Sequence, residues 1–441
     1  MRNVVIKNFR CYENKSIEFR SGINLLIGDN SVGKTSMLRA CNLVMNSFFS
    51  GYSDENTTWR SADNNDFRNT GIAELPVEIS FNFGSWDFQP LNSTNGNIIE
   101  FDLDGEYKIE KKSKKNSRNL VTGLAALKEY ASLLQKHSHE IVDGEIRQNH
   151  ALPLYACFST EDIHTVRKFD KNKFKKHQPK PSFGYFESYD CKGLMECWIK
   201  RLLVLKEAKK GEDEINTVRN AIIDALGTDG CNIIDDIDIR YNDGQVYFHF
   251  IDGRESESEL LSDGYRRLVN IVMDIAFRCA LLNKTMYGAQ CYKYTNGTVI
   301  IDEIDEHLHP ELQIHILKAL HETFPKIQFI VSTHAPLVMS SIENTSENVV
   351  YKLEYKDGVY SHKELNTYGL DANLILEEKV GVLSRVPLID SKMKKILELI
   401  SKRNLEEANK MISELETITD PTQPELVKLR ALLNRIEAIG V

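Results

Sequence analysis

Short apolar runs in the first 110 residues alternate with polar positions and predict a set of strands. Residues 23–27 form a short, mainly apolar run with the length of a buried strand. A polar loop with two glycines follows, and from Thr35 the apolar residues recur at helical spacing. The other predicted strands are an edge strand at 1–10, its partner at 16–19, an alternating strand at 75–83 and a hairpin at 98–109 that turns at Asp104-Gly105.

Residues 110–230 show a different pattern, in which helical periodicity dominates. Apolar side chains fall on one side of predicted helices at 120–135, 191–209 and 214–226. The short apolar run 154–158 fits a core strand. No long heptad repeat is present, so a coiled-coil arm is not expected. This region is interpreted as a compact, mainly helical insert.

Strand patterns return after residue 230, and the chain then turns helical. The predicted elements are strands in 233–251, a helix to about 282, strands at 298–301 and 328–332 around a helix at 310–323, a β-unit at 349–359, and helices at 390–401, 404–417 and 423–437. The pattern divides the chain into an α/β lobe at 1–109, the insert at 110–230, a second lobe at 231–370 and a helical tail at 371–441.

The loop between the buried strand and the first helix carries the strongest chemical signal. It has the P-loop pattern G-x-x-x-x-G-K-[ST] and comprises Gly28, Asp29, Asn30, Ser31, Val32, Gly33, Lys34 and Thr35, followed by Ser36. Its backbone N–H groups and the helix N-terminus attract phosphate oxygens. Lys34 is expected to reach the β- and γ-phosphates and Thr35 to give a hydroxyl to Mg²⁺. ATP and Mg²⁺ are therefore the expected ligands.

Two carboxylates, Asp302 and Glu303, directly follow the apolar run 298–301. Asp302 is expected to hold the Mg²⁺ through water, and Glu303 to position the attacking water as the catalytic base. His334 follows the strand at 328–332 and is expected to contact the γ-phosphate, although a histidine in such a place is often structural. These residues must meet the P-loop in space to form one site.

A second phosphate site is predicted at Ser262-Asp263-Gly264, where a helix begins. The plain structural interpretation is an N-cap. The P-loop already surrounds the γ-phosphate of this chain's own nucleotide. Ser262 and Gly264 are therefore expected to contact a nucleotide held by another copy, which predicts a head-to-head dimer or higher oligomer.

In this order, the motifs GDNSVGKT, LSDG, IIDE and STHAP resemble those of the ABC-type ATPase heads of RecF, SMC/Rad50 and OLD proteins. The resemblance covers roughly residues 1–85 and 230–370, and it implies an α/β, ABC-type P-loop ATPase head with composite sites. Lys34, Thr35, Asp302, Glu303 and His334 of one head would face Ser262 and Gly264 of a second. The resemblance also places Arg10 near the nucleotide; the alternative is a plain edge strand.

The signature LSDGYRR differs from the LSGGQ of transporters, and no Toprim-type acidic cluster follows His334. Residues 368–373 and the tail instead resemble the ATPase subunits (PtuA) of Septu-type anti-phage defence systems. That resemblance implies an ATP-gated sensor or scaffold that controls a separate nuclease of the HNH type, docked through the tail or the insert. A RecF-like DNA-repair ATPase that binds DNA across a head dimer is the alternative, and a non-hydrolysing ATP switch is a third hypothesis.

Composition changes this picture little. The 441 residues carry a net charge of -9, which gives no whole-chain attraction to nucleic acid. The basic runs 167–180 and 111–115 are candidate DNA or RNA contacts, or plain solvated loops. The first residues fit a strand better than a signal peptide, and no apolar run is long enough to span a membrane. With eight scattered cysteines, reduced thiols and a cytoplasmic location are expected.

Overall fold

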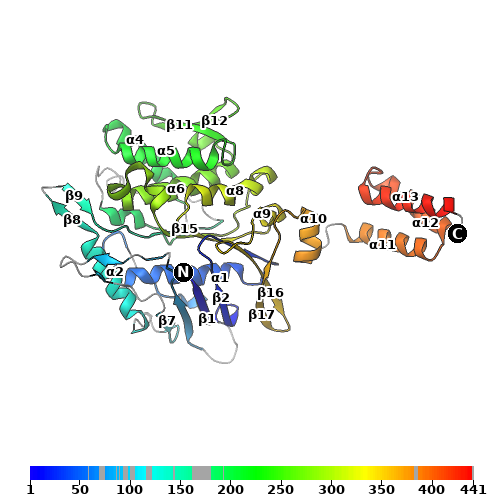
Figure 1. Ribbon diagram of the computed structural model, residues 1–441, viewed down its shortest axis with the longest axis horizontal. Coiled ribbons are helices and arrows are strands. Elements are labelled where there is room, and N and C mark those ends of the chain that lie inside the picture. Colours follow the sequence, from blue (N-terminus) through cyan, green and yellow to red (C-terminus); the bar gives the residue numbers. More distant parts are fainter. Residues whose placement is uncertain are drawn as a thin grey trace. The chain divides into compact units, whose positions relative to one another are not determined.

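A computed structural model divides the chain into two compact units, Met1–Ala372 and Asn373–Val441 (Figure 1). The structure describes all residues except 58, 69–74, 86, 89, 93–97, 100–104, 116–121, 143–144, 161–179, 192, 382–385 and 440–441. Among the described residues, no helix has both the length and the apolar character needed to cross a bilayer.

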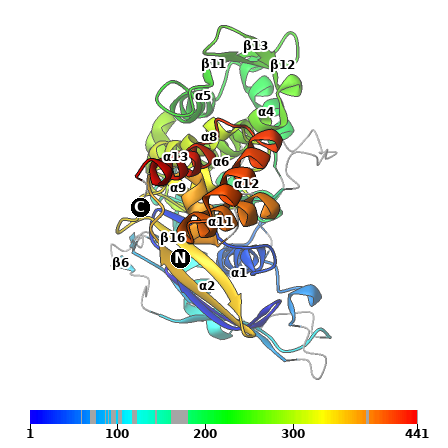
Figure 2. The same ribbon diagram turned by 90° about the vertical axis from the view of Figure 1, so that its right-hand side faces the viewer.

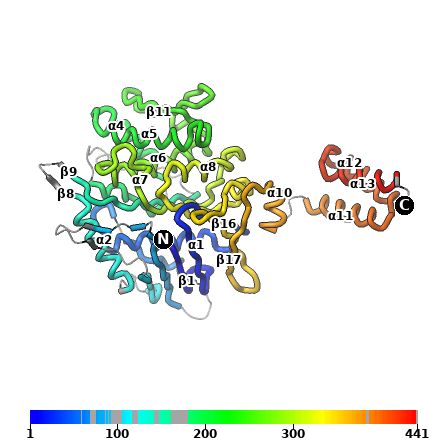
Figure 3. The backbone as a smooth tube through the Cα atoms, viewed as in Figure 1, coloured from blue at the N-terminus to red at the C-terminus, as the bar shows by residue number. Residues whose placement is uncertain are grey.

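A six-stranded sheet forms the centre of the first unit, with the order β10-β14-β15-β3-β16-β17. Its strands are β3 (Ile23–Ile27), β10 (Leu154–Phe158), β14 (Gly297–Ile301), β15 (Ile327–Ser332), β16 (Val349–Lys356) and β17 (Val359–Leu365). All pairs are parallel except β16 with β17. Early β3 lies between the late strands β15 and β16, so distant parts of the sequence meet at this point (Figure 3).

Helices cover both faces of this sheet. α1 (Lys34–Asn46) packs against β14 and β15 on one face, and α6 (Asp263–Tyr287) and α8 (Pro310–Thr323) lie on the other (Figures 1 and 2). The strands β3, β14 and β15 are consequently buried along their whole length, as their almost unbroken apolar sequences require.

A four-stranded antiparallel sheet, β2-β1-β4-β7, contacts α1 through β1 and β4. Its strands are β1 (Asn3–Phe9), β2 (Tyr12–Glu18), β4 (Val77–Asn82) and β7 (Tyr107–Lys111). β1 pairs with both β2 and β4, so the prediction of an edge strand at 1–10 is wrong. Buried Val4 and Ile6 alternate with less buried neighbours, which shows which face of the strand is covered. This alternation carries no information on the number of neighbouring strands.

The predicted hairpin at 98–109 is also wrong. β6 (Ile98–Ile99) pairs with β5 (Leu91–Asn92), whereas β7 pairs with β4. The pairing with β4 sets Tyr107 opposite Phe81, and both rings are buried. Burial of large side chains against a distant strand therefore outweighs the local turn signal.

The region 110–230 mixes helices with strands. It contains α2 (Ala125–His137), β8 (His139–Val142), β9 (Glu145–Gln148), α4 (Met195–Glu207) and α5 (Glu212–Leu226). It also contributes β10 to the central sheet, beside β14. Beyond it, β11 (Ile234–Arg240), β12 (Gln245–Phe250) and β13 (Glu255–Glu257) form a separate three-stranded sheet. The segment predicted as an insert thus contributes one strand, β10, to the central sheet.

The second unit contains the three helices predicted for the tail: α11 (Pro387–Ser401), α12 (Leu405–Ile418) and α13 (Pro424–Ile439). Their apolar stripes bury a core of their own, made of Met393, Ile396, Ile400, Ala408, Ile412, Leu415, Leu426, Leu429 and Leu433. Internal packing thus accounts for most of the amphipathic pattern. Docking of a partner on this unit stays a prediction.

Candidate nucleotide site

The P-loop joins β3 to α1 at the edge of the sheet where the parallel strands end. Gly28 and Gly33 have φ angles of 143° and 95°, in the region that favours glycine. A Cβ atom on Gly28 would lie 2.5 Å from the Leu353 carbonyl oxygen, and one on Gly33 would lie 2.4 Å from the Tyr12 hydroxyl. Both positions therefore require glycine, because neighbouring atoms leave no room for a Cβ atom and the φ angle is positive.

Lys34 is buried within the loop. Its Nζ donates to the carbonyl oxygens of Gly28 at 2.8 Å and Asp29 at 3.0 Å. Burial lowers the pKa of Lys34, while the nearby carboxylates of Asp302 and Glu303 oppose that shift. The ammonium group thus contacts the loop carbonyls and feels the charge of the carboxylates, and a phosphate oxygen would offer it a stronger, charged acceptor.

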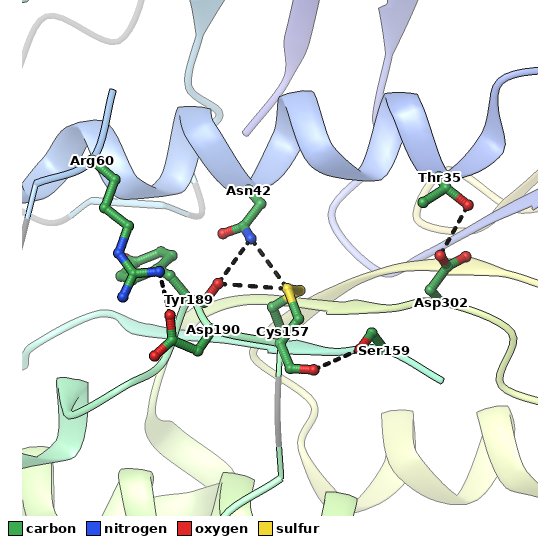
Figure 4. The surroundings of a disulfide bond; sticks show 9 residues. Thr35, Asn42, Arg60, Cys157, Ser159, Tyr189, Asp190 and Asp302 are labelled. Carbon is green, nitrogen blue, oxygen red and sulfur yellow. Dashed lines mark hydrogen bonds and ion pairs between the residues drawn. A yellow bond between two sulfur atoms is a disulfide. The ribbon is translucent and has the colours of Figure 1, made fainter. Parts of the chain in front are cut away.

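Thr35 and Asp302 face each other across the site, one from α1 and the other from the end of β14 (Figure 4). The Thr35 hydroxyl donates to Asp302 Oδ2 at 3.0 Å. Ser332, at the end of β15, donates to Asp302 Oδ1 and accepts from the Glu303 N–H at 2.8 Å. The sequence motifs of three separate elements therefore meet here, as expected.

The donor set fits Mg²⁺. Thr35 and Asp302 offer a hydroxyl and a carboxylate oxygen, the ligand types that this ion prefers. When bound, Mg²⁺ would neutralise charge on the β- and γ-phosphates. Its binding by these two residues remains a prediction.

Arg267 of α6 was not anticipated as a site residue. Its side chain is completely buried, yet it donates to the carbonyl oxygens of Asp302 at 2.7 Å and Glu303 at 3.0 Å. It also forms an ion pair with Glu306 at 2.5 Å. Glu303 itself has a φ of 50°, an uncommon conformation for a residue with a side chain, and Arg267 holds its carbonyl there.

The loops that follow β14 and β15 are joined through Asp305. Its Oδ1 accepts from the Thr333 hydroxyl at 2.5 Å and from the His334 N–H at 3.3 Å. The His334 side chain is exposed. Asp305 therefore fixes the backbone that presents His334 to the site, and it is a second residue that sequence reasoning missed.

Ser262 and Gly264 have different surroundings at the start of α6. Ser262 is the N-cap, its hydroxyl accepts from the Tyr265 N–H at 3.5 Å, and its side chain is exposed. Gly264 is buried, and a Cβ atom there would lie 2.4 Å from the His307 carbonyl oxygen. Ser262 is thus available to a second copy, whereas Gly264 permits close packing of α6 on the loop after β14.

The Arg10 side chain is already engaged with a buried carboxylate. Its Nε donates to Asp66 Oδ1 at 2.9 Å, and the same carboxylate accepts from Arg39 of α1 at 3.3 Å. A contact between Arg10 and a nucleotide stays a prediction, and it would require this ion pair to be shared or opened.

The two basic runs give little support for a nucleic-acid surface. Residues 161–179, which hold most of the run 167–180, lie outside the described residues. Lys111 is buried and donates to the Ala62 carbonyl oxygen at 2.6 Å. At least this lysine of the run 111–115 has a structural role.

A disulfide joins Cys157, in β10 beside β14, to Cys191, so the expectation that all thiols are reduced is not met (Figure 4). Asn42 of α1 donates to the Cys191 sulfur at 3.2 Å and to the Tyr189 carbonyl oxygen at 3.2 Å. The two cysteines are 34 residues apart and share no spacing motif. Only the fold brings them together.

We expect six reactive thiols out of eight when the protein is denatured without reductant, and eight after reduction. Cys157→Ser should destabilise the protein by about 2–4 kcal/mol relative to the oxidised form, because the bridge restricts the unfolded chain. Thiol labelling with mass mapping checks both statements. Eight thiols without reductant would show that the bridge is absent from the protein in solution.

Comparison with known proteins settles the family. The sequence profile described as an AAA ATPase domain matches residues 1–339, well over half of the chain. The chain belongs to this family of ATPases.

Several curated proteins are similar to parts of this ATPase. A Retron Vc95 probable ATPase of Vibrio cholerae is 38% identical over 142 residues, which are 32% of this chain and 26% of that protein. A Septu protein PtuA of Bacillus mycoides is 30% identical over 210 residues, 47% of this chain and 27% of its own. A DNA replication and repair protein RecF of Lactococcus lactis is 24% identical over 188 residues, 40% of this chain and 48% of its own. The ATPase thus spans less than half the length of each of these relatives.

Among solved structures, an SMC head bound to the C-winged helix domain of ScpA is 17% identical, with a TM-score of 0.42. The likeness covers 83% of the ATPase and 98% of that chain. The fold assignment rests on the ATPase's own topology: a parallel sheet with the P-loop after β3 and the paired carboxylates after β14.

Proposed function

We propose that this ATPase is an ATP-gated subunit of an anti-phage defence complex and that it controls a separate effector, a nuclease of the HNH type. The observation that carries the proposal is the likeness of parts of the chain to a retron ATPase and to Septu PtuA, at 38% identity over 142 residues and 30% over 210. In this proposal ATP joins two heads at composite sites, and hydrolysis changes their geometry. The effector then responds to the state of the heads.

The surroundings of Ser262 support the composite site. Its side chain is exposed at the N-terminus of a long helix, α6, where backbone N–H groups favour an anion. The P-loop lies at the N-terminus of a different helix, α1. Each chain therefore carries two anion-attracting helix ends, and a symmetric dimer would pair them twice.

Ser262→Arg is expected to abolish ATP-dependent association of heads, because a long cation would fill the place of the small hydroxyl at the junction. ATP binding to the P-loop should stay within about twofold, since surface changes away from a binding site have small effects. Light scattering with and without ATP measures the association. Ser346→Arg, at an exposed loop serine, is the matched control. Association of Ser262→Arg heads at the wild-type ATP concentration would contradict the composite site.

The proposed partnership is tested by co-expressing the tagged ATPase with the products of its neighbouring genes. A stable complex that contains a nuclease is expected, and its cleavage of DNA or RNA should change when ATP is added. A Lys34→Ala variant should keep the complex but lose the effect of ATP, because it lacks the cation that holds the phosphates. An ATPase that binds none of these products would overturn the proposal.

A RecF-like role in DNA repair is the second candidate, favoured by the 24% identity to RecF over 188 residues. It predicts that DNA stimulates ATP hydrolysis by the isolated ATPase. Neutralising the lysines of the run 167–180 should then remove that stimulation.

A further inference from the structure

Two tyrosines, Tyr355 and Tyr360, form a pair near the turn of the β16–β17 hairpin, beside the P-loop. We propose that they are the platform on which the base of the bound nucleotide stacks. The proposal rests on the ATP site and is independent of any effector or of head association.

The hairpin reaches the nucleotide site by the geometry of the sheet. β16 runs parallel to β3, and Lys352 is the partner of Ile27, the last residue before the P-loop. The next residue, Leu353, places its carbonyl oxygen against Gly28, where a Cβ atom would lie only 2.5 Å away. The rest of β16 therefore extends past the end of β3, on the side of the sheet where nucleotides bind in α/β proteins.

Consecutive residues of α1 show which way the nucleotide runs. The Thr35 hydroxyl points to Asp302, so the metal and the terminal phosphates belong on that side. Ser36, about 100° further around the helix, lies on the side of Cys11, whose sulfur would be 2.9 Å from a Cβ atom on Gly33. Burial raises the pKa of the Cys11 thiol, and the nearby side chains of Ser36 and Tyr360 oppose that shift. In this proposal the nucleoside end of the ligand extends toward Cys11 and Tyr360.

The tyrosine pair is held firmly at this place. Tyr355 and Tyr360 are cross-strand partners with ring centroids 4.4 Å apart and planes at 36°. Tyr360 meets the edge of Tyr12 at 5.1 Å, and the Tyr12 hydroxyl donates to the Gly33 carbonyl oxygen at 2.9 Å. An unbroken chain of contacts therefore links the P-loop glycine to the pair.

The pair also leaves an aromatic surface in solvent. Tyr355 is 53% exposed, so the pair is accessible to a ligand from solvent. Aromatic rings stack on nucleotide bases in nucleic-acid-binding proteins, and every base has a suitable face. The plain structural alternative is a cross-strand pair that only stabilises the hairpin. Only the stacking interpretation predicts that the effect of a tyrosine substitution depends on whether the ligand carries a base.

The test compares ATP with inorganic tripolyphosphate, which has the phosphates but no base. Tyr355→Ala is expected to weaken ATP binding by about 5- to 150-fold, the range seen when a stacking aromatic residue is removed. Tripolyphosphate affinity should stay within about twofold, and its binding also shows that the P-loop of the variant is folded. Calorimetry with Mg²⁺ present measures both ligands.

Two further variants sharpen the result. Tyr355→Phe should retain ATP affinity, because it keeps the aromatic face. Tyr294→Ala is the matched control: Tyr294 is 56% exposed and pairs with Tyr287 at 5.4 Å and 33°. It should bind both ligands as the wild type does. An equal loss for ATP and tripolyphosphate in Tyr355→Ala, or no loss for either ligand, would overturn the platform.

Discussion

Glu303→Gln is expected to lower ATP hydrolysis by about 10²- to 10⁴-fold, the usual contribution of a positioned general base. The amide has nearly the same size as the carboxylate but cannot accept the proton of the attacking water. Lys34, Thr35 and Asp302 remain in place, so ATP affinity should change by less than about threefold. Single-turnover hydrolysis and equilibrium binding of ATP measure the two effects separately.

The same variant bears on the association of heads. If ATP joins two heads and hydrolysis separates them, Glu303→Gln should accumulate the associated form whenever ATP is present. Glu311→Gln, at an exposed glutamate in the first turn of α8, is the control and should behave as the wild type. Unchanged hydrolysis in Glu303→Gln would mean that another group activates the water. Slow hydrolysis without accumulation of the associated form would show that Glu303 acts in hydrolysis but that hydrolysis does not control the association of heads.

The sequence predicts the centre of this fold well for a physical reason. Strands β3, β14 and β15 are buried on both faces, so their sequences are short apolar runs that few other structures allow. The ends of parallel strands meet at one edge of a sheet. Motifs placed directly after such runs, such as Gly28–Thr35 and Asp302-Glu303, were therefore predicted to form one site.

The parts that sequence reasoning missed all depend on contacts between distant segments. β7 pairs with β4 rather than β6, and Cys157 meets Cys191, because of packing that no local pattern encodes. Arg267 is the clearest case. In the sequence it is one of two arginines after the signature, and nothing distinguishes it from Arg266. In the structure it is buried, while Arg266 is half-buried and donates to the Glu259 carbonyl oxygen.

Arg267→Met is expected to reduce hydrolysis by at least about tenfold while leaving ATP bound, because it removes a residue that positions Glu303. The guanidinium is the link between α6, which begins at Ser262, and the carbonyl groups of Asp302 and Glu303. Without it, Glu303 is no longer held in its left-handed conformation. Since Glu306 also loses its partner, the free energy of unfolding should fall by about 3 kcal/mol. A fall in kcat with an unchanged Kd for ATP would identify positioning.

Arg278→Met separates this role from general stability. Arg278 lies on the same helix, is equally buried, pairs with Asp274 at 2.6 Å and donates to the Gly184 carbonyl oxygen at 2.8 Å. Its loss should cost a similar free energy of unfolding but leave hydrolysis per folded molecule unchanged, since it does not contact the loop after β14.

Arg267→Lys should hydrolyse ATP at a rate between those of the wild type and Arg267→Met, because one ammonium cannot serve two carbonyls and a carboxylate in the same fixed geometry. Equal losses of hydrolysis in Arg267→Met and Arg278→Met would show that Arg267 has only a structural role. A loss of hydrolysis in Arg267→Met alone would support α6 as the element that links a contact at Ser262 to the position of Glu303.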